Sequence, residues 1–316
     1  MITGLEREAE QLLKFARERF DVVNYILDND EVLIPTSDRQ DRIMRGIVNW
    51  YASEIEVIGL ENLEEAEDKA DKLNTVLITT RNHQTYVDIA CGRKALESVE
   101  KKNFADLQVH PGGLDIYKRY RGLYLPANEI AVVVVAPQDT MGITRGITGD
   151  LAGEFSEEQR KLLEACKSSF SMLTRRSIRT LAEQVSLTKR MTIFPETDFP
   201  PHDGLTQRPK PEVSAFFKKP GQIVLPIRTD GPHLIFGPDS LEDGGNRPIN
   251  FTFEMVIGKP FTTDQAHKAY EATEADIALA DVVFKPVWDL RPNRGDPRYT
   301  RFFADLPSVY DYPEAA

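Results

Sequence analysis

The sequence predicts an α/β fold, a mixed and largely parallel sheet flanked by helices, with a small helical domain at the N-terminus. Short apolar runs such as residues 75–80 have the length and composition of buried strands. Helical periodicity alternates with such runs from residue 54 onwards, whereas residues 5–51 show helical periodicity alone. In the 316 residues we therefore expect a helical domain at 1–53 and an α/β domain at 54–316.

Two amphipathic helices make up the expected N-terminal domain. Residues 5–28 place apolar side chains at helical spacing among Glu, Arg and Lys. A second helix follows Pro35, with a cap at one of residues 36–38 and with Ile43, Met44, Ile47, Val48 and Tyr51 on one face. We expect this domain to support the larger one by packing, or to restrict access to its site.

In the larger domain, strands are expected at residues 55–58, 75–80, 131–136, 143–144, 191–194, 223–227 and 251–257. Helices are expected at residues 88–99, at 156–185 with a break near Ser168 and Ser169, and at 263–284, while 62–73 is a helix or a loop. Residues 103–130 and 197–221 hold much of the Pro and Gly and show little periodicity. Long irregular segments inside a domain are often functional loops.

Charge and composition exclude several classes of protein. The net charge of −11 argues against binding to nucleic acid. No apolar run reaches the roughly 18 to 20 residues that span a bilayer, and the N-terminus does not resemble a signal peptide. We expect a cytoplasmic protein, or the mature form of an imported one. Cys91 and Cys166 lie far apart, and no cluster has the spacing of metal ligands, so we expect no metal and no cofactor.

The candidate catalytic residues are His83 and Asp88, which follow the apolar segment 75–80 directly. A neutral imidazole accepts a proton from an alcohol only if its other ring nitrogen is held in the right tautomer, and a nearby carboxylate can hold it. The pair lies where a strand is expected to turn into a helix, and sites in α/β proteins open at the carboxyl ends of strands. This arrangement indicates a general base for chemistry on an acyl group.

Four separated blocks in a characteristic order extend the interpretation. They read Asn82-His83 to Asp88, then Gly142-Ile143-Thr144-Arg145-Gly146, then Phe194-Pro195-Glu196-Thr197, and then Val224-Leu225-Pro226-Ile227. With these blocks the chain resembles the glycerolipid acyltransferase superfamily from about residue 54 to residue 261. Within it, the chain looks most like the soluble glycerol-3-phosphate acyltransferases of the plastid type, which implies the plastid stroma if the chain is the mature form of an imported protein.

The resemblance implies a reaction and a set of site residues. An acyl group would pass from an acyl thioester, carried by acyl carrier protein or by coenzyme A, to a hydroxyl of glycerol 3-phosphate. His83 would be the base and Asp88 the residue that orients it. Arg145 and one of Arg175 and Arg176 would bind the acceptor phosphate, since a guanidinium matches phosphate oxygens in a bidentate way. Glu196 and Thr197 would complete the substrate site, with the Glu196 carboxylate accepting a hydrogen bond from the acceptor hydroxyl.

One block departs from the family pattern. The third block usually continues with Gly, a hydroxyl residue and Arg, whereas this chain has Thr197-Asp198-Phe199. Phosphate binding must then rest on the arginines named above, or on Arg208 or Lys210 in the following loop. We expect His110, His202 and His233 to be loop residues, with His202 the one closest in sequence to Glu196.

Two alternatives stay open from the sequence. The chain could act on lysophosphatidate or another lysophospholipid, with residues 5–28 as an interfacial helix in peripheral contact with a membrane. It could also be an inactive module that binds an acyl carrier, which the altered residues after Glu196 would explain.

Overall fold

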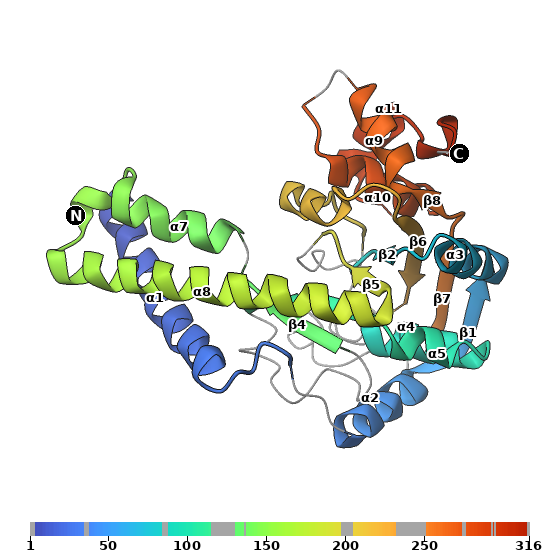
Figure 1. Ribbon diagram of the computed structural model, residues 1–316, viewed down its shortest axis with the longest axis horizontal. Coiled ribbons are helices and arrows are strands. Elements are labelled where there is room, and N and C mark those ends of the chain that lie inside the picture. The colour runs from blue at the N-terminus through green and yellow to red at the C-terminus, as the bar shows by residue number, and fades with distance from the viewer. Residues whose placement is uncertain are drawn as a thin grey trace. The chain divides into compact units, whose positions relative to one another are not determined.

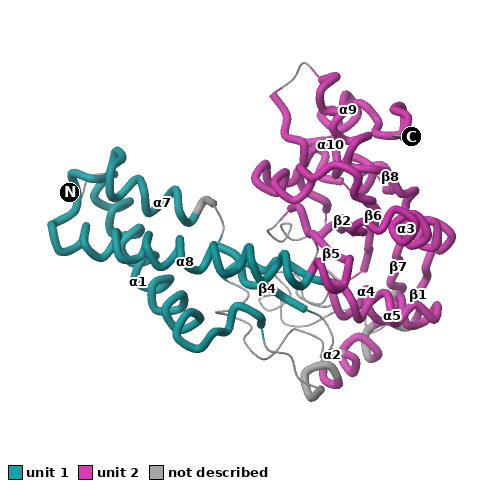
Figure 2. Tube along the Cα trace, viewed as in Figure 1, with its two compact units in different colours: residues 1–35, 109–123, 130–184 teal, residues 36–108, 124–129, 185–316 magenta. Residues whose placement is uncertain are grey.

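A computed structural model of the chain describes residues 4–34, 38–83, 88–114, 130–135, 137–196, 205–231, 251–273, 276–291, 293 and 295–314. The chain divides into two compact units, which Figure 2 shows in different colours. Unit 1 comprises Met1–Pro35, Val109–Leu123 and Ile130–Gln184, and unit 2 comprises Thr36–Gln108, Tyr124–Glu129 and Val185–Ala316. This division does not coincide with a boundary at residue 53, because the chain passes from one unit to the other several times.

Unit 1 contains the long helices α1 (Gly4–Asp28) and α7 (Pro137–Thr148) and most of α8 (Glu157–Thr188). The buried positions of α1, among them Ala9, Ala16 and Val23, recur every seven residues and so lie on one face. The parallel strands β3 (Val109–Gly113) and β4 (Ile130–Val134) form a separate two-stranded sheet. A short 3-10 helix, Ala152–Glu154, lies between α7 and α8.

Three predictions for unit 1 are wrong. Residues 143–144 belong to α7 and not to a strand, since Ile143 and Gly146 are buried at helical spacing. Helix α8 runs through Ser168 and Ser169 without a break, because the buried Ser169 hydroxyl donates to Asn24 Oδ1 at 2.9 Å. Strand β3 occupies part of the segment that we expected to be irregular.

Unit 2 is built on a six-stranded sheet in the order β1-β7-β6-β2-β5, with β8 paired to β6. The pairs β1/β7, β6/β2 and β2/β5 are parallel, whereas β7 and β8 run antiparallel to β6. The strands are β1 (Ala52–Ile58), β2 (Leu77–Arg81), β5 (Arg190–Ile193), β6 (Ile223–Asp230), β7 (Phe251–Ile257) and β8 (Phe261–Thr262). This mixed, largely parallel sheet confirms the predicted fold class.

Helices flank the sheet of unit 2 (Figure 1). They are α2 (Asp38–Tyr51), α3 (Leu60–Lys72), α4 (Asp88–Ser98), α5 (Lys102–Asp106), α9 (Thr263–Glu271), α10 (Leu279–Asp289) and α11 (Thr300–Asp305), with 3-10 helices at Pro211–Phe217, Pro297–Tyr299 and Val309–Asp311. The single helix expected at 263–284 is two helices. The second helix, α10, has its own N-terminal cap, because the Asp281 carboxylate accepts a hydrogen bond from the Ala278 N–H at 2.8 Å.

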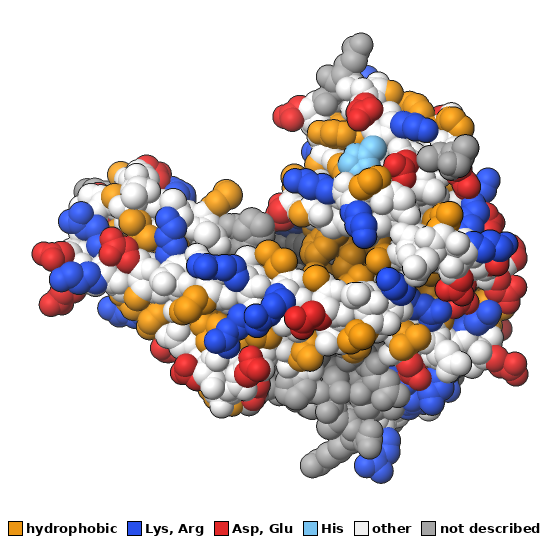
Figure 3. Space-filling view, in the orientation of Figure 1, with side chains coloured by type: hydrophobic (Ala, Val, Ile, Leu, Met, Phe, Trp, Pro, Cys, Tyr) orange, Lys and Arg blue, Asp and Glu red, His pale blue; other side chains and the backbone are white. Residues whose placement is uncertain are grey.

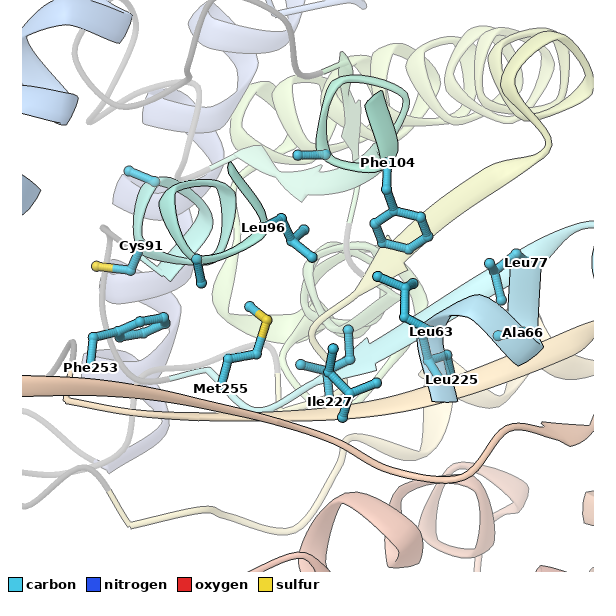
Figure 4. Packing of buried hydrophobic residues seen from close by; sticks show 14 of the residues in the cluster. Leu63, Ala66, Leu77, Cys91, Leu96, Phe104, Leu225, Ile227, Phe253 and Met255 are labelled. Atoms are coloured by element: carbon cyan, nitrogen blue, oxygen red, sulfur yellow. The ribbon is translucent and has the colours of Figure 1, made fainter. Parts of the chain in front are cut away.

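The main core of unit 2 lies between helices α3, α4 and α5 and one face of the sheet. In Figure 4, Leu63 of α3 and Leu96 of α4 point toward Leu225 and Ile227 of β6. These side chains are at most 3% exposed, and burial of each contributes roughly 1.5–3 kcal/mol. The core therefore holds α4, which begins at Asp88, firmly on the sheet.

The C-terminal helices form a second packed layer in unit 2. Helix α10 contacts β6 and β2, and its Trp288 ring stacks on Phe303 of α11 with centroids 4.3 Å apart. Across the described parts of both units, no helix is both long enough and apolar enough to cross a membrane. Acidic and basic side chains are interspersed on the visible face of the protein (Figure 3).

Gly92 of α4 provides a sharp test of the packing near the sheet. An added Cβ at Gly92 would lie 1.9 Å from a terminal guanidinium nitrogen of the buried Arg81, so Gly92→Ala must displace that side chain. Gly46 of α2 is a matched control, since it also lies inside a helix but has open space around its Cα. We expect Gly46→Ala to raise the free energy of unfolding by roughly 0.5–1 kcal/mol and Gly92→Ala to lower it by roughly 1–3 kcal/mol. Urea unfolding followed by circular dichroism measures both changes, and equal effects would contradict this packing.

Candidate active site

The candidate site lies at the carboxyl end of β2, the strand next to the edge strand β5 in the sheet of unit 2. All five residues of β2 are buried, and the strand has parallel neighbours on both sides, β5 and β6. The chain leaves the strand at Arg81 and reaches His83 two residues later. The ends of three strands therefore surround the histidine backbone.

His83 and Asp88 are joined by a hydrogen bond. Nδ1 of His83 and Oδ2 of Asp88 are 2.7 Å apart. A carboxylate only accepts, so Nδ1 carries the proton, and the lone pair of a neutral imidazole is then on Nε2. Asp88 is the first residue of α4, where the helix dipole favours a negative charge. The Asp88 side chain is 1% exposed and that of His83 is 15% exposed, so the ring reaches solvent while its partner does not.

Asn82 fixes the chain immediately before the histidine. Its Nδ2 donates to the Thr229 carbonyl at 2.8 Å, and its Oδ1 accepts from the Thr229 N–H at 2.7 Å. Both groups are buried, so the two bonds replace those that a β-ladder would make past the end of β2. The side chain of Asn82 thus ties the turn that carries His83 to strand β6.

Glu196 follows β5, which lies on the side of β2 opposite to β6. Its carboxylate accepts one hydrogen bond from the His83 backbone N–H through Oε2 and another from the Gln207 backbone N–H through Oε1. Only 2% of Glu196 is exposed, and burial raises its pKa to about 8. The hydrogen bonds from Gln207 and His83, and then the charge of Arg228, limit that rise.

Aromatic and basic side chains complete the surroundings of His83. The Phe194 ring lies against the His83 ring with centroids 4.7 Å apart, and the Arg81 guanidinium lies 5.7 Å from the centroid of Phe194. Arg81 and Arg228 are both buried, which places two positive charges in the same interior as Asp88 and Glu196. Buried charges of opposite sign offset part of each other's desolvation cost.

The predicted site residues fall into two groups. His83, Asp88 and Glu196 come together in unit 2, whereas Arg145, Arg175 and Arg176 belong to unit 1. Thr197 lies outside the described residues. The role of the three arginines in phosphate binding stays a prediction.

Within unit 1 the three arginines have different environments. Arg145 of α7 binds both oxygens of Asp150, at 2.9 and 2.7 Å, and Glu8 at 3.2 Å. Arg176 of α8 donates to the Leu27 carbonyl at 3.0 Å, at the end of α1. Arg175 is exposed and donates to the Ser171 carbonyl one turn back in its own helix, at 3.3 Å.

Among the further basic and histidine candidates, the structure describes Arg208, Lys210 and His110. Arg208 makes a bidentate pair with the buried Asp281, at 2.8 and 2.7 Å, and its guanidinium lies over the Phe302 ring. His110 is a buried residue of β3 and not a loop residue, because it pairs with β4. His202 and His233 lie outside the described residues. No group of three or more His, Cys, Asp or Glu in the described part of the chain could hold a metal ion.

Sequence reasoning gave no role to several residues that shape the site, among them Arg81, Phe194, Gln207 and Thr229. Phe194 lies inside the third block and could have been noted there, and Arg81 precedes the first block directly. Gln207 and Thr229 act through backbone atoms, for which the identity of the side chain carries no signal.

Cys91 is excluded as a nucleophile, since burial and the nearby Asp88 raise the pKa of its thiol.

Comparisons with known proteins add little to this geometry. No protein-family model matches the chain, and no curated protein sequence matches it. Among solved structures, the chain is similar to the crystal structure of the 1-acyl-sn-glycerophosphate (LPA) acyltransferase PlsC from Thermotoga maritima. Sequence identity is 14% and the TM-score is 0.38, over 91% of this chain and 98% of that chain. At this identity and TM-score, the similarity assigns neither an activity nor a substrate to this chain.

The raised pKa of Glu196 predicts a pH-dependent contribution to stability. The folded state binds a proton to this carboxyl more tightly than the unfolded state, so its contribution to the free energy of unfolding falls as the pH rises from about 4.5 to about 8. Glu196→Gln does not titrate. We expect the stability difference, wild type minus variant, to fall by a few kcal/mol between pH 5 and pH 8, measured by urea unfolding at several pH values. A difference that stays constant over this range would contradict the assignment.

Proposed function

We propose that the chain transfers an acyl group from an acyl thioester of acyl carrier protein or coenzyme A to the hydroxyl of glycerol 3-phosphate, which is the first step of phospholipid synthesis. The observation that carries the proposal is the hydrogen bond of 2.7 Å between His83 Nδ1 and the buried Asp88. It holds the imidazole in the tautomer that a general base needs. The order of the four sequence blocks supports the choice of acyl transfer.

The reaction follows from the positions of two nitrogens on one ring. Nε2 of His83 takes the proton of the acceptor hydroxyl while the hydroxyl oxygen bonds to the thioester carbonyl carbon. The tetrahedral intermediate then expels the thiolate, which takes the proton back from Nε2 and leaves as a thiol. Asp88 stabilises the transient imidazolium through Nδ1. No metal or cofactor enters these steps, and the acyl thioester is the second substrate.

Substitutions at the dyad test the proposal directly. We expect His83→Ala to abolish thioester-dependent acylation, and Asp88→Asn to lower kcat by roughly 10³- to 10⁴-fold, because an amide no longer enforces the tautomer. His267→Ala is a matched control, since this half-buried histidine of α9 contacts the Phe217 carbonyl and not the site. Its activity should remain that of the wild type.

The substrates are tested by an acceptor screen with one acyl thioester and mass spectrometry of the products. Glycerol 3-phosphate should be acylated in preference to lysophosphatidate and other lysophospholipids. Preference for lysophosphatidate would contradict the proposed acceptor but would still support acyl transfer. Thioester loss at the same rate without an acceptor indicates a hydrolase, and no turnover with any acceptor indicates an inactive module that binds an acyl carrier.

We retain Arg145, Arg175 and Arg176 as the groups that bind the acceptor phosphate, and Thr197 as a substrate residue. Among the arginines, Arg175 is the exposed one that is held by a backbone carbonyl alone in the contacts given above, so a phosphate has no carboxylate to displace there. Arg175→Ala should raise KM for glycerol 3-phosphate by roughly tenfold. This factor corresponds to a loss of about 1.4 kcal/mol of binding free energy, close to the contribution of one charged hydrogen bond. Arg179→Ala is the control on the same helix, and its exposed side chain faces Glu183. Equal KM values for the two variants would remove Arg175 from the site.

A further inference from the structure

Glu196 connects two segments that are far apart in the sequence. One carboxylate oxygen accepts from the N–H of His83 and the other accepts from the N–H of Gln207 at 2.5 Å. His83 precedes Glu196 by 113 residues, and Gln207 follows it by 11. Both oxygens therefore point at backbone amides, one of which belongs to the proposed catalytic residue.

The Gln207 end of this bridge is itself fixed. The Lys210 N–H donates to the Pro195 carbonyl at 2.9 Å, and the Asp296 N–H donates to the Thr206 carbonyl at 2.9 Å. The neighbouring Arg208 is held by its bidentate pair with Asp281 of α10. The carboxylate of Glu196 thus holds the His83 backbone against a segment that is anchored on both sides.

A glutamate suits this bridge better than its nearest relatives. A glutamate side chain has two oxygens, and each can accept a hydrogen bond from an N–H whether or not the group carries a proton. Glutamine has one acceptor oxygen, so its NH₂ group would face one of the two N–H donors. Aspartate is one methylene shorter, so its carboxylate cannot reach both the His83 N–H and the Gln207 N–H unless the backbone at position 196 moves.

We propose that Glu196 is a positioning residue, which holds the His83 backbone so that the imidazole stays in line with Asp88, and that it does not bind the acceptor hydroxyl. The kinetic part of this inference rests on the proposed acyl transfer. The structural part concerns His83 alone and can be tested without any substrate.

The experiment combines kinetics with NMR of the full chain. We expect Glu196→Gln to lower kcat by roughly 10- to 100-fold, because small misplacement of a catalytic group is costly, while KM for glycerol 3-phosphate changes by less than about twofold. The backbone amide and imidazole nitrogen signals of His83, assigned by comparison with His83→Asn, should shift. Glu196→Asp keeps both acceptor oxygens and should give a smaller loss in kcat and smaller shifts, which also covers a Gln variant that fails to fold.

Leu63→Ala is the control for a general loss of stability, since it leaves a cavity in the core between α3 and the sheet. Its His83 signals should match the wild type. The inference is overturned if Glu196→Gln raises KM for the acceptor at unchanged kcat with the His83 signals in place, since Glu196 then binds substrate. If no acyl thioester is turned over by the wild type, the proposed function fails, while shifted His83 signals in Glu196→Gln still support the positioning role.

Discussion

The hydrogen bond between His83 and Asp88 is the interaction on which the proposed function depends. Its two residues come from different kinds of structure, since His83 follows a strand and Asp88 begins a helix. The bond therefore forms only if α4 has a fixed position on the sheet, which the core between α4, α5 and the strands ensures. Hydrophobic packing, which is not directional, thus fixes the direction of one polar contact.

A second constraint is the cost of charge in the interior. Asp88, Glu196, Arg81 and Arg228 are all buried around one turn of the chain. Burial disfavours the ionised form of Glu196 and the charge of Arg228 favours it, and backbone and ring contacts take up several polar atoms of the group. Such a group resists exchange of single members, because removal of one leaves another without compensation. The same balance keeps the histidine at the edge of this polar interior, with part of its ring in solvent.

The fold class and the contact between His83 and Asp88 could be predicted from the sequence because both depend on local patterns. The apolar run 75–80 and the block from His83 to Asp88 can each be recognised from consecutive residues alone. The position of Asn82 against Thr229, 147 residues away, depends on strand order, which periodicity does not encode. The hydrogen bonds of Glu196 could not be predicted for a similar reason, since its partners are backbone atoms. Helix α8 was expected to break at two serines, whose buried hydrogen bond only the tertiary structure supplies.

The topology of the sheet has a consequence for the order in which the protein can be made. Strand β2 pairs with β5 and β6, which are synthesised more than a hundred residues later. At usual translation rates that interval is on the order of 10 s, during which β2 has apolar faces and unpaired edges. Contacts so distant in sequence also slow the closure of the sheet. The nascent chain is thus exposed to aggregation at the strand that later carries the histidine.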